Sequence, residues 1–131
     1  LFIRDYIYVK DVADAYRTLA EQMDNPAVVG QAFNFSTDLP LTTIELVEKI
    51  QQLMGKSNLD PLILNEATNE IAAQHLCSAK AQQLLGWQAR YGVAVGLTET
   101  IDWYTKHLQQ GQKTVARKQF FRISDEKNIT G

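Results

Sequence analysis

Apolar residues recur along this chain with two different periods, which predict short strands alternating with helices. From Lys10 to Met23 an apolar residue returns every three or four positions, as expected for a helix with one apolar stripe. The stripe consists of Val12, Ala15, Tyr16, Leu19, Ala20 and Met23. Asn25-Pro26 ends the helix, because a residue that precedes proline disfavours the helical conformation.

The second predicted helix carries its own start and stop signals. Thr42 and Glu45 have the spacing of a capping box, in which each residue satisfies a free N–H at the helix start. Gly55 stands where a left-handed residue ends the helix. Two further helices are expected, a short one from Ser78 to Leu85 before Gly86, with Trp87 anchoring the turn, and a last one from Val93 to Leu108.

Three runs rich in aromatic and β-branched residues predict strands, at residues 5–9, 32–36 and 61–64. A polar stretch from Asn65 to Gln74 then reads as a loop long enough to carry binding groups. Strands alternating with helices indicate an α/β fold, with a small set of short strands and about four helices.

Composition narrows the classes of partner. The formal net charge is -2 and the 131 residues contain one cysteine, Cys77. Nucleic-acid and anionic-membrane surfaces need clustered positive charge, so we expect neither partner. No apolar run is long enough for a membrane span, and the start of the chain lacks the features of a secretory signal. We therefore expect a cytoplasmic protein.

The usual signatures of catalysis and cofactor binding are absent from the sequence. No set of glycines has the close spacing that a dinucleotide-binding loop requires. Tyr6 and Lys10 match a Tyr-x-x-x-Lys spacing, but Tyr6 falls in a predicted strand, where the two side chains would lie too far apart to act together. His75, His107 and Cys77 give no metal-ligand spacing. We assign no catalytic, cofactor-binding or metal-binding residue to the chain.

Arg4 is the residue whose position suggests binding. An arginine at the edge of a strand can present its planar fork to a phosphate group. The same arginine could instead form a surface salt bridge with Asp5 or Asp11. The residues alone leave both interpretations open.

Five segments in order resemble the extended short-chain dehydrogenases that act on nucleotide sugars, one of them the helix start from Thr43 to Val47. Arg4 to Ala13 is similar to the family motif Arg-Asp-Phe/Tyr-Val/Ile-x-Val-x-Asp-Val, and Gly30 to Ser36 to its Gly-x-x-Tyr/Phe-Asn strand. Ser78 to Trp87 resembles the Ser-Lys-Ala and Leu-Gly-Trp segment, and Gly96 to Tyr104 the closing helix. The resemblance covers about residues 3 to 108.

The resemblance implies a fold, a partner and a cofactor. The chain would be the carboxy-terminal, substrate-binding lobe of a Rossmann-type enzyme, and a missing amino-terminal half would bind NAD or NADP and carry catalysis. The partner would be a nucleotide-diphosphate sugar, and the full-length enzyme is expected to be a homodimer. By position in the motifs, Arg4 matches the diphosphate contact, Glu70 the ribose contact, and Asn34 the family asparagine.

The chain also departs from the family pattern. Many relatives have a second phosphate-binding arginine three residues before the acid, where this chain has Ala67. The loop from Asn65 to Ile71 looks more like relatives of CDP-glucose 4,6-dehydratase. We therefore expect part of a nucleotide-diphosphate-hexose 4,6-dehydratase, with a 4-epimerase or a non-catalytic binding module as alternatives. Residues 1–111 would form the substrate-binding part, and residues 112–131 an extension of uncertain order.

Overall fold

The computed structural model describes residues 2–64, 66 and 69–126, which fall into two compact units, residues 1–98 and 99–131. The described elements are β1 (Ile3–Arg4), α1 (Val9–Glu21), β2 (Leu41–Thr42), α2 (Thr43–Leu53), α3 (Ala79–Leu85) and α4 (Val93–Glu126). This is the α/β class that the periodicity predicts, with four helices and a two-stranded antiparallel sheet among the described residues.

Helix starts and stops follow the local signals closely. Thr42 and Glu45 form the predicted capping box, and the N–H of Thr42 donates to the Glu45 carboxylate, which lowers the pKa of Glu45. Gly55 and Gly86 have φ of 63° and 66°, the left-handed conformation expected at helix ends. Ser78 precedes α3 as predicted, but its hydroxyl donates to Asp38 instead of capping the helix.

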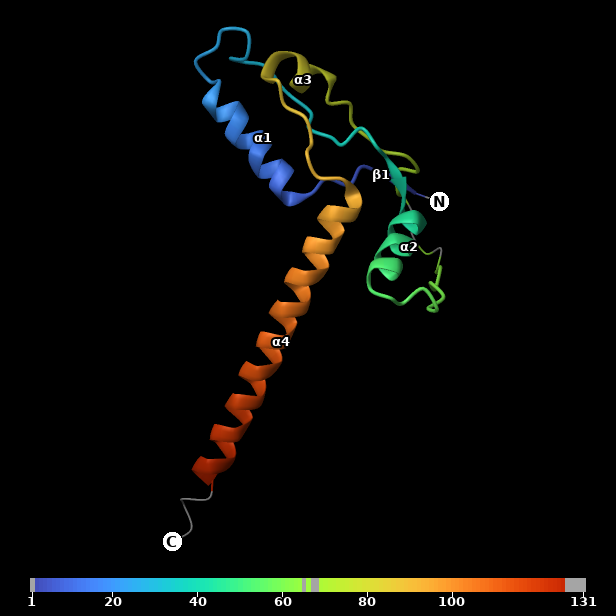
Figure 1. The fold of residues 1–131 in the computed structure, drawn as a ribbon, viewed down its shortest axis with the longest axis vertical. Coiled ribbons are helices and arrows are strands. Elements are labelled where there is room, and N and C mark those ends of the chain that lie inside the picture. The colour runs from blue at the N-terminus through green and yellow to red at the C-terminus, as the bar shows by residue number, and fades with distance from the viewer. Residues whose placement is uncertain (1, 65, 67–68, 127–131) are drawn as a thin grey trace. The chain divides into compact units, whose positions relative to one another are not determined.

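The strands are much shorter than predicted. Residues 5–8 lead into α1 outside the described strands, and residues 32–36 and 61–64 belong to no described strand either. A strand needs a neighbour to bond with, and the sequence pattern does not say whether one is present. Figure 1 shows the segment after Gly30 running beside α3. There Lys80 donates to the Gln31 side chain at 2.8 Å and to the carbonyl of Ala32 at 2.9 Å.

Helix α4 continues to Glu126, well past Leu108, where the sequence indicates its end. The residues after Leu108 include several good helix formers and no proline, and Gly111 lowers helix stability by only about 1 kcal/mol relative to alanine. The loss of the apolar period after Leu108 therefore does not end the helix.

The core of the first unit lies between α1, α3 and the segment 28–35. Its buried members are Ala15, Val28, Ala81, Leu85 and Trp87, with Phe33 and Phe35 packed against them. Trp87 meets Phe35 edge to face, with ring centroids 4.9 Å apart, and so anchors the turn after α3 as predicted.

Helix α1 is turned differently from the prediction. Tyr16 and Met23, which we expected to be buried, are 70% and 56% exposed. Asp11 is 1% exposed instead, and its carboxylate accepts the backbone N–H groups of Arg90 at 2.9 Å and Tyr91 at 3.2 Å. A buried carboxylate needs such donors, so these bonds fix which face of α1 packs inward.

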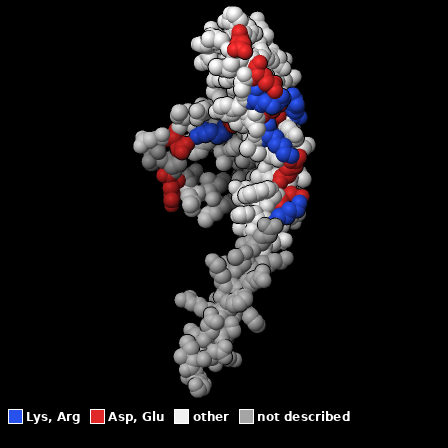
Figure 2. All heavy atoms as spheres, turned by 90° about the vertical axis from the view of Figure 1, so that its left-hand side faces the viewer, with Lys and Arg blue, Asp and Glu red and all other residues white. Residues whose placement is uncertain are grey.

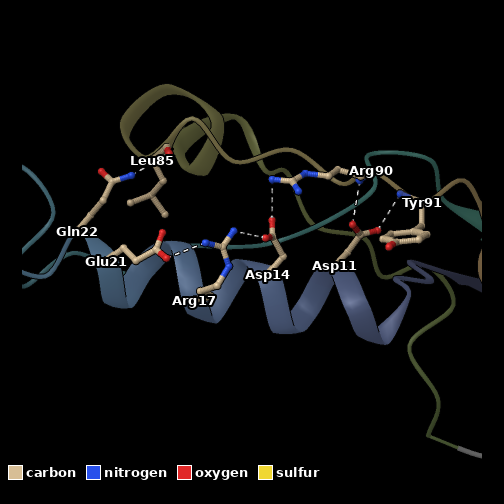
Figure 3. A network of polar contacts seen from close by, with 8 residues as sticks. All are labelled: Asp11, Asp14, Arg17, Glu21, Gln22, Leu85, Arg90 and Tyr91. Atoms are coloured by element: carbon tan, nitrogen blue, oxygen red, sulfur yellow. Dashed lines mark hydrogen bonds and ion pairs between the residues drawn. The ribbon is translucent and has the colours of Figure 1, made fainter.

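Figure 3 shows this network along α1. At the other end of the helix, the Gln22 amide donates to the carbonyl of Leu85 at 2.9 Å. Between them Asp14 pairs with Arg17 at 2.6 Å and with Arg90 at 3.3 Å. The hydrogen bond from Arg17 lowers the pKa of Asp14. The segment 85–91 is thus bonded to the start of α1, to its middle and to the residue that follows its last turn.

Replacing Asp11 by alanine should therefore destabilise the fold. The change leaves the N–H groups of Arg90 and Tyr91 without their acceptor, and hydrogen bonds to a charged group contribute about 1.5 to 3 kcal/mol each. We expect the free energy of unfolding to fall by about 3 kcal/mol or more in urea titrations. Asp14→Asn, which removes a neighbouring carboxylate that is paired by side chains only, is the control and should have a much smaller effect. Equal losses in both variants would contradict the account.

Candidate functional site

The candidate site is built around β1, whose two residues are bonded on both sides. β1 pairs antiparallel with β2, with Ile3 opposite Thr42 and Arg4 opposite Leu41. On its other side, the N–H of Ile3 donates to the carbonyl of Ala72 at 2.9 Å, and the N–H of Gln74 donates to the carbonyl of Ile3 at 3.0 Å. The end of the polar loop is therefore held directly beside Arg4.

Arg4 uses both halves of its guanidinium group. Nη1 donates to two backbone carbonyls, those of Ile3 and Ile71, at 2.8 Å each. Nη2 donates to Oε2 of Glu70 at 2.6 Å. The guanidinium carbon also lies 5.4 Å from the centre of the Phe2 ring. These contacts hold the orientation of a long side chain that would otherwise be free to rotate.

The ion pair stays open to solvent. The side chains of Arg4 and Glu70 are 25% and 50% exposed. Of the five N–H groups of arginine, the contacts among the described residues use three, which leaves Nε–H and one N–H of Nη2 on the same edge of the guanidinium plane. That edge can bind two oxygens of a phosphate group in parallel.

The salt bridge that Arg4 forms is not one of those weighed from the sequence. Both proposed partners are occupied elsewhere: Asp11 binds backbone N–H groups of the segment 90–91, and Asp5 binds Ser36. Glu70 is the partner instead. The sequence places these two residues 66 positions apart, so only the folded chain reveals the pair.

A second polar cluster, which the sequence analysis missed, lies on the chain next to Arg4. Asp5 accepts from the Ser36 hydroxyl at 2.5 Å and from the N–H of Leu76 at 3.3 Å. Ser36 accepts the N–H of Asp38 at 2.8 Å, and Asp38 accepts from the N–H and hydroxyl of Ser78. The cluster joins the residue after β1 to the chain that follows the loop, so it fixes the loop from its far end.

Asn34 is not joined to this site by any hydrogen bond among the described residues. It is exposed, and it lies between Phe33 and Phe35, which both pack against the core. Alternate residues of an extended chain point to opposite sides, which accounts for its exposure. Its role in substrate binding stays a prediction, and Ala67 lies outside the described residues.

The described glycines are not arranged in a dinucleotide-binding loop. Gly30, Gly55 and Gly86 sit in turns and helix ends, and no described strand leads into a glycine-rich turn before a helix. Gly92 precedes α4, but Gly96 packs under Tyr8, whose Cβ would lie 3.0 Å from an added methyl group. Tyr6 precedes α1, which begins at Val9, so Tyr6 and Lys10 do not share a helix face.

One face of the described residues shows the mixture of charges that the sequence predicts (Figure 2). On the face drawn in Figure 2, basic and acidic side chains are interspersed along the molecule. No three His, Cys, Asp or Glu residues of the described chain are grouped so that they could hold a metal ion. No helix in the described part is both long enough and apolar enough to cross a membrane.

Comparison with known proteins finds relatives of one enzyme group. No protein-family model matches the chain. It is 31% identical over 105 residues to a bifunctional UDP-glucose 4-epimerase and UDP-xylose 4-epimerase of Pisum sativum, covering 77% of this chain and 29% of the relative. The chain spans about 30% of the length of the curated relatives that it matches.

Solved structures of the same group have the same fold. A UDP-glucose-4-epimerase from Stenotrophomonas maltophila, with bound NAD and formylated UDP-arabinopyranose, matches with a TM-score of 0.74 and 26% identity, over 83% of this chain and 32% of that chain. A dTDP-glucose 4,6-dehydratase from Bacillus anthracis str. Ames, in complex with NAD, matches with a TM-score of 0.68 and 26% identity, over 81% of this chain and 32% of that chain.

The contacts of Arg4 predict a local effect on the loop when this side chain is removed. Arg4→Ala loses the bonds to Glu70 and to the carbonyl of Ile71, while the backbone pairing of Ile3 with residues 72–74 remains. We expect the Gln74 amide to exchange with solvent hydrogen about 3- to 10-fold faster, since an exposed ion pair with one further hydrogen bond contributes about 1 kcal/mol.

Hydrogen exchange followed by mass spectrometry measures this rate, with the amides of α3 as the internal reference. Unchanged exchange at Gln74 would show that Arg4 does not hold the loop. Faster exchange throughout α3 would indicate general destabilisation instead.

Proposed function

This chain belongs to the extended short-chain dehydrogenase/reductase family, where it corresponds to a carboxy-terminal part, and we propose that it holds the substrate of a nucleotide-sugar epimerase or dehydratase. In this proposal the chain binds the nucleotide diphosphate, and an amino-terminal half outside the chain binds NAD or NADP and carries the catalytic residues. Two solved structures that match this chain over 32% of their own length contain NAD, which supports that division of labour.

The observation that carries the proposal is the fixed guanidinium of Arg4 beside Glu70. A diphosphate is best held by a planar cation that can donate two parallel hydrogen bonds, and Arg4 keeps two N–H groups on one edge. A ribose carries two neighbouring hydroxyls that can donate to a carboxylate, and Glu70 supplies one 2.6 Å from the arginine. Arg4 and Glu70 thus provide complementary groups for the two parts of a nucleotide.

The exposed face of α1 offers a surface for the rest of such an enzyme. Val9 and Tyr16 on α1, and Met23 in the turn after it, follow one another at intervals of seven residues, and each is more than half exposed. Ala13 and Ala20 lie between them and are exposed as well. An apolar stripe of this kind normally packs against another element. We propose that the amino-terminal half covers it; the homodimer expected of the whole enzyme stays a prediction.

The domain boundaries of the proposal follow the family resemblance. Residues 1–111 form the substrate-binding part, and residues 112–131 form an extension. The backbone of α4 runs across this boundary as far as Glu126. The extension is therefore proposed to begin within a helix and not at a linker.

The reaction we propose is 4,6-dehydration of a nucleotide-diphosphate hexose, from the sequence of the loop 65–71. The second candidate is 4-epimerisation, because the names of most of the similar curated proteins are those of UDP-glucose 4-epimerases. One similar protein of Arabidopsis thaliana has a name that includes UDP-glucose 4,6-dehydratase activity. Both reactions need the same nucleotide-diphosphate contacts from this chain.

Product analysis of the full-length protein separates the two reactions. Incubation with NAD and, in turn, UDP-, dTDP-, CDP- and GDP-hexoses should give a 4-keto-6-deoxy sugar from one of them, detected by mass spectrometry as a loss of one water. A C4-inverted hexose of unchanged mass would replace the dehydratase proposal by the epimerase. Absence of either product with all four nucleotides would contradict an enzymatic role.

The proposed role of Arg4 predicts a selective loss of affinity. Arg4→Ala in the full-length protein should weaken binding of the nucleoside diphosphate by about 10- to 150-fold, because a charge-assisted hydrogen bond contributes about 1.5 to 3 kcal/mol. NAD affinity should stay the same. Arg17→Ala is the matched control, since among the described residues Arg17 pairs with Asp14 and Glu21 of its own helix and not with the loop. In calorimetric titrations, equal affinities of the Arg4 and Arg17 variants would exclude the phosphate contact.

A further inference from the structure

The edge of Arg4 that is left for a phosphate shares one of its two nitrogens with Glu70. Nη1 is committed to the carbonyls of Ile3 and Ile71, and Glu70 sits on Nη2 at 2.6 Å. A phosphate that binds two N–H groups in parallel has to use the edge formed by Nε and Nη2, because both N–H groups of Nη1 are taken. It would therefore meet the Glu70 carboxylate on the nitrogen that it needs.

The charges make this overlap unfavourable. Arg4 and Glu70 carry opposite charges that cancel. Theirs is the only ion pair that joins β1 to the described part of the loop. A diphosphate next to an unmoved Glu70 would place like charges within a few ångströms at a surface, where their repulsion is partly screened but still present. Binding of the diphosphate thus favours release of Glu70.

The loop is arranged so that Glu70 can leave without unfolding the site. The Glu70 side chain is half exposed, and an exposed ion pair is weak. Backbone bonds from Ile3 to Ala72 and Gln74 hold the chain directly after Ile71, so the side chain can move while the loop end stays in place. Asn69, the residue that precedes Glu70, has a left-handed backbone conformation, with φ of 64°.

From these contacts we infer that Glu70 is an internal competitor for the diphosphate. In the free protein the carboxylate sits on Nη2, one of the two nitrogens of the phosphate-binding edge of Arg4, and the arriving diphosphate displaces it from there. The freed carboxylate is then available to the ribose hydroxyls. The inference rests on the proposed function. It adds that the diphosphate replaces Glu70 on Arg4, so that nucleotide binding breaks the Arg4–Glu70 ion pair.

The exchange predicts that removing the charge of Glu70 strengthens binding of the diphosphate part of a nucleotide and weakens binding of its ribose part. Calorimetric titration of the full-length protein with inorganic diphosphate and with UDP gives the two dissociation constants for each variant. In Glu70→Gln we expect inorganic diphosphate to bind about 2- to 5-fold more tightly, the range expected when a weak exposed ion pair no longer competes. The additional affinity of UDP over inorganic diphosphate should fall about 10-fold, because the carboxylate no longer accepts from the ribose.

Glu66→Gln is the matched control, because it removes the same charge from an exposed glutamate of the same loop that has no described contact with Arg4. It should leave both constants unchanged. Inorganic diphosphate that binds Glu70→Gln no more tightly than the unmodified protein would overturn the exchange, and so would equal tightening in both glutamine variants.

The failure of the exchange can be told apart from failure of the proposed function. If Arg4→Ala weakens UDP binding but Glu70→Gln does not strengthen diphosphate binding, the diphosphate contact stands and the exchange is wrong. If the unmodified protein binds neither inorganic diphosphate nor UDP, and none of the other nucleotides tested as substrates, the proposed function itself is wrong.

Discussion

The site depends on the pairing of one residue, Ile3, on both sides. Its strand pairs with β2, while its own N–H and carbonyl bond to residues 72 and 74. Through these bonds a strand of two residues becomes the centre of three adjacent segments that are far apart in the sequence. Arg4 follows directly, so its guanidinium reaches Glu70 and the carbonyl of Ile71. Without the pairing of Ile3, the binding groups would have no fixed relation to each other.

The rest of the first unit is organised by buried polar groups as much as by apolar contacts. Only five apolar residues are buried in the part of the chain whose burial the structure describes. Asp11 fixes the orientation of α1 against the segment 90–91, and Asp5, Ser36, Asp38 and Ser78 join three stretches of chain beside the site. Directional hydrogen bonds of this kind specify one arrangement where a small apolar core would allow several.

Local signals predicted the helices well, and long-range pairing explains where the prediction failed. The capping box at Thr42 and the glycine stops at 55 and 86 depend on neighbours within a few residues, so the sequence displays them directly. The face of α1 that is buried depends on backbone donors 79 and 80 residues away, and the partner of Arg4 lies 66 residues away. Motif resemblance picked out both Arg4 and Glu70, but only the fold shows that they touch.

The most direct test of the account is a structure of the full-length protein with a bound nucleoside diphosphate. The account predicts two phosphate oxygens within hydrogen-bond distance of Nε and Nη2 of Arg4, with the Glu70 carboxylate moved off Nη2 and onto the ribose hydroxyls. Nη1 should still donate to the carbonyls of Ile3 and Ile71. A nucleotide bound elsewhere, with the Arg4–Glu70 pair intact, would contradict the central claim.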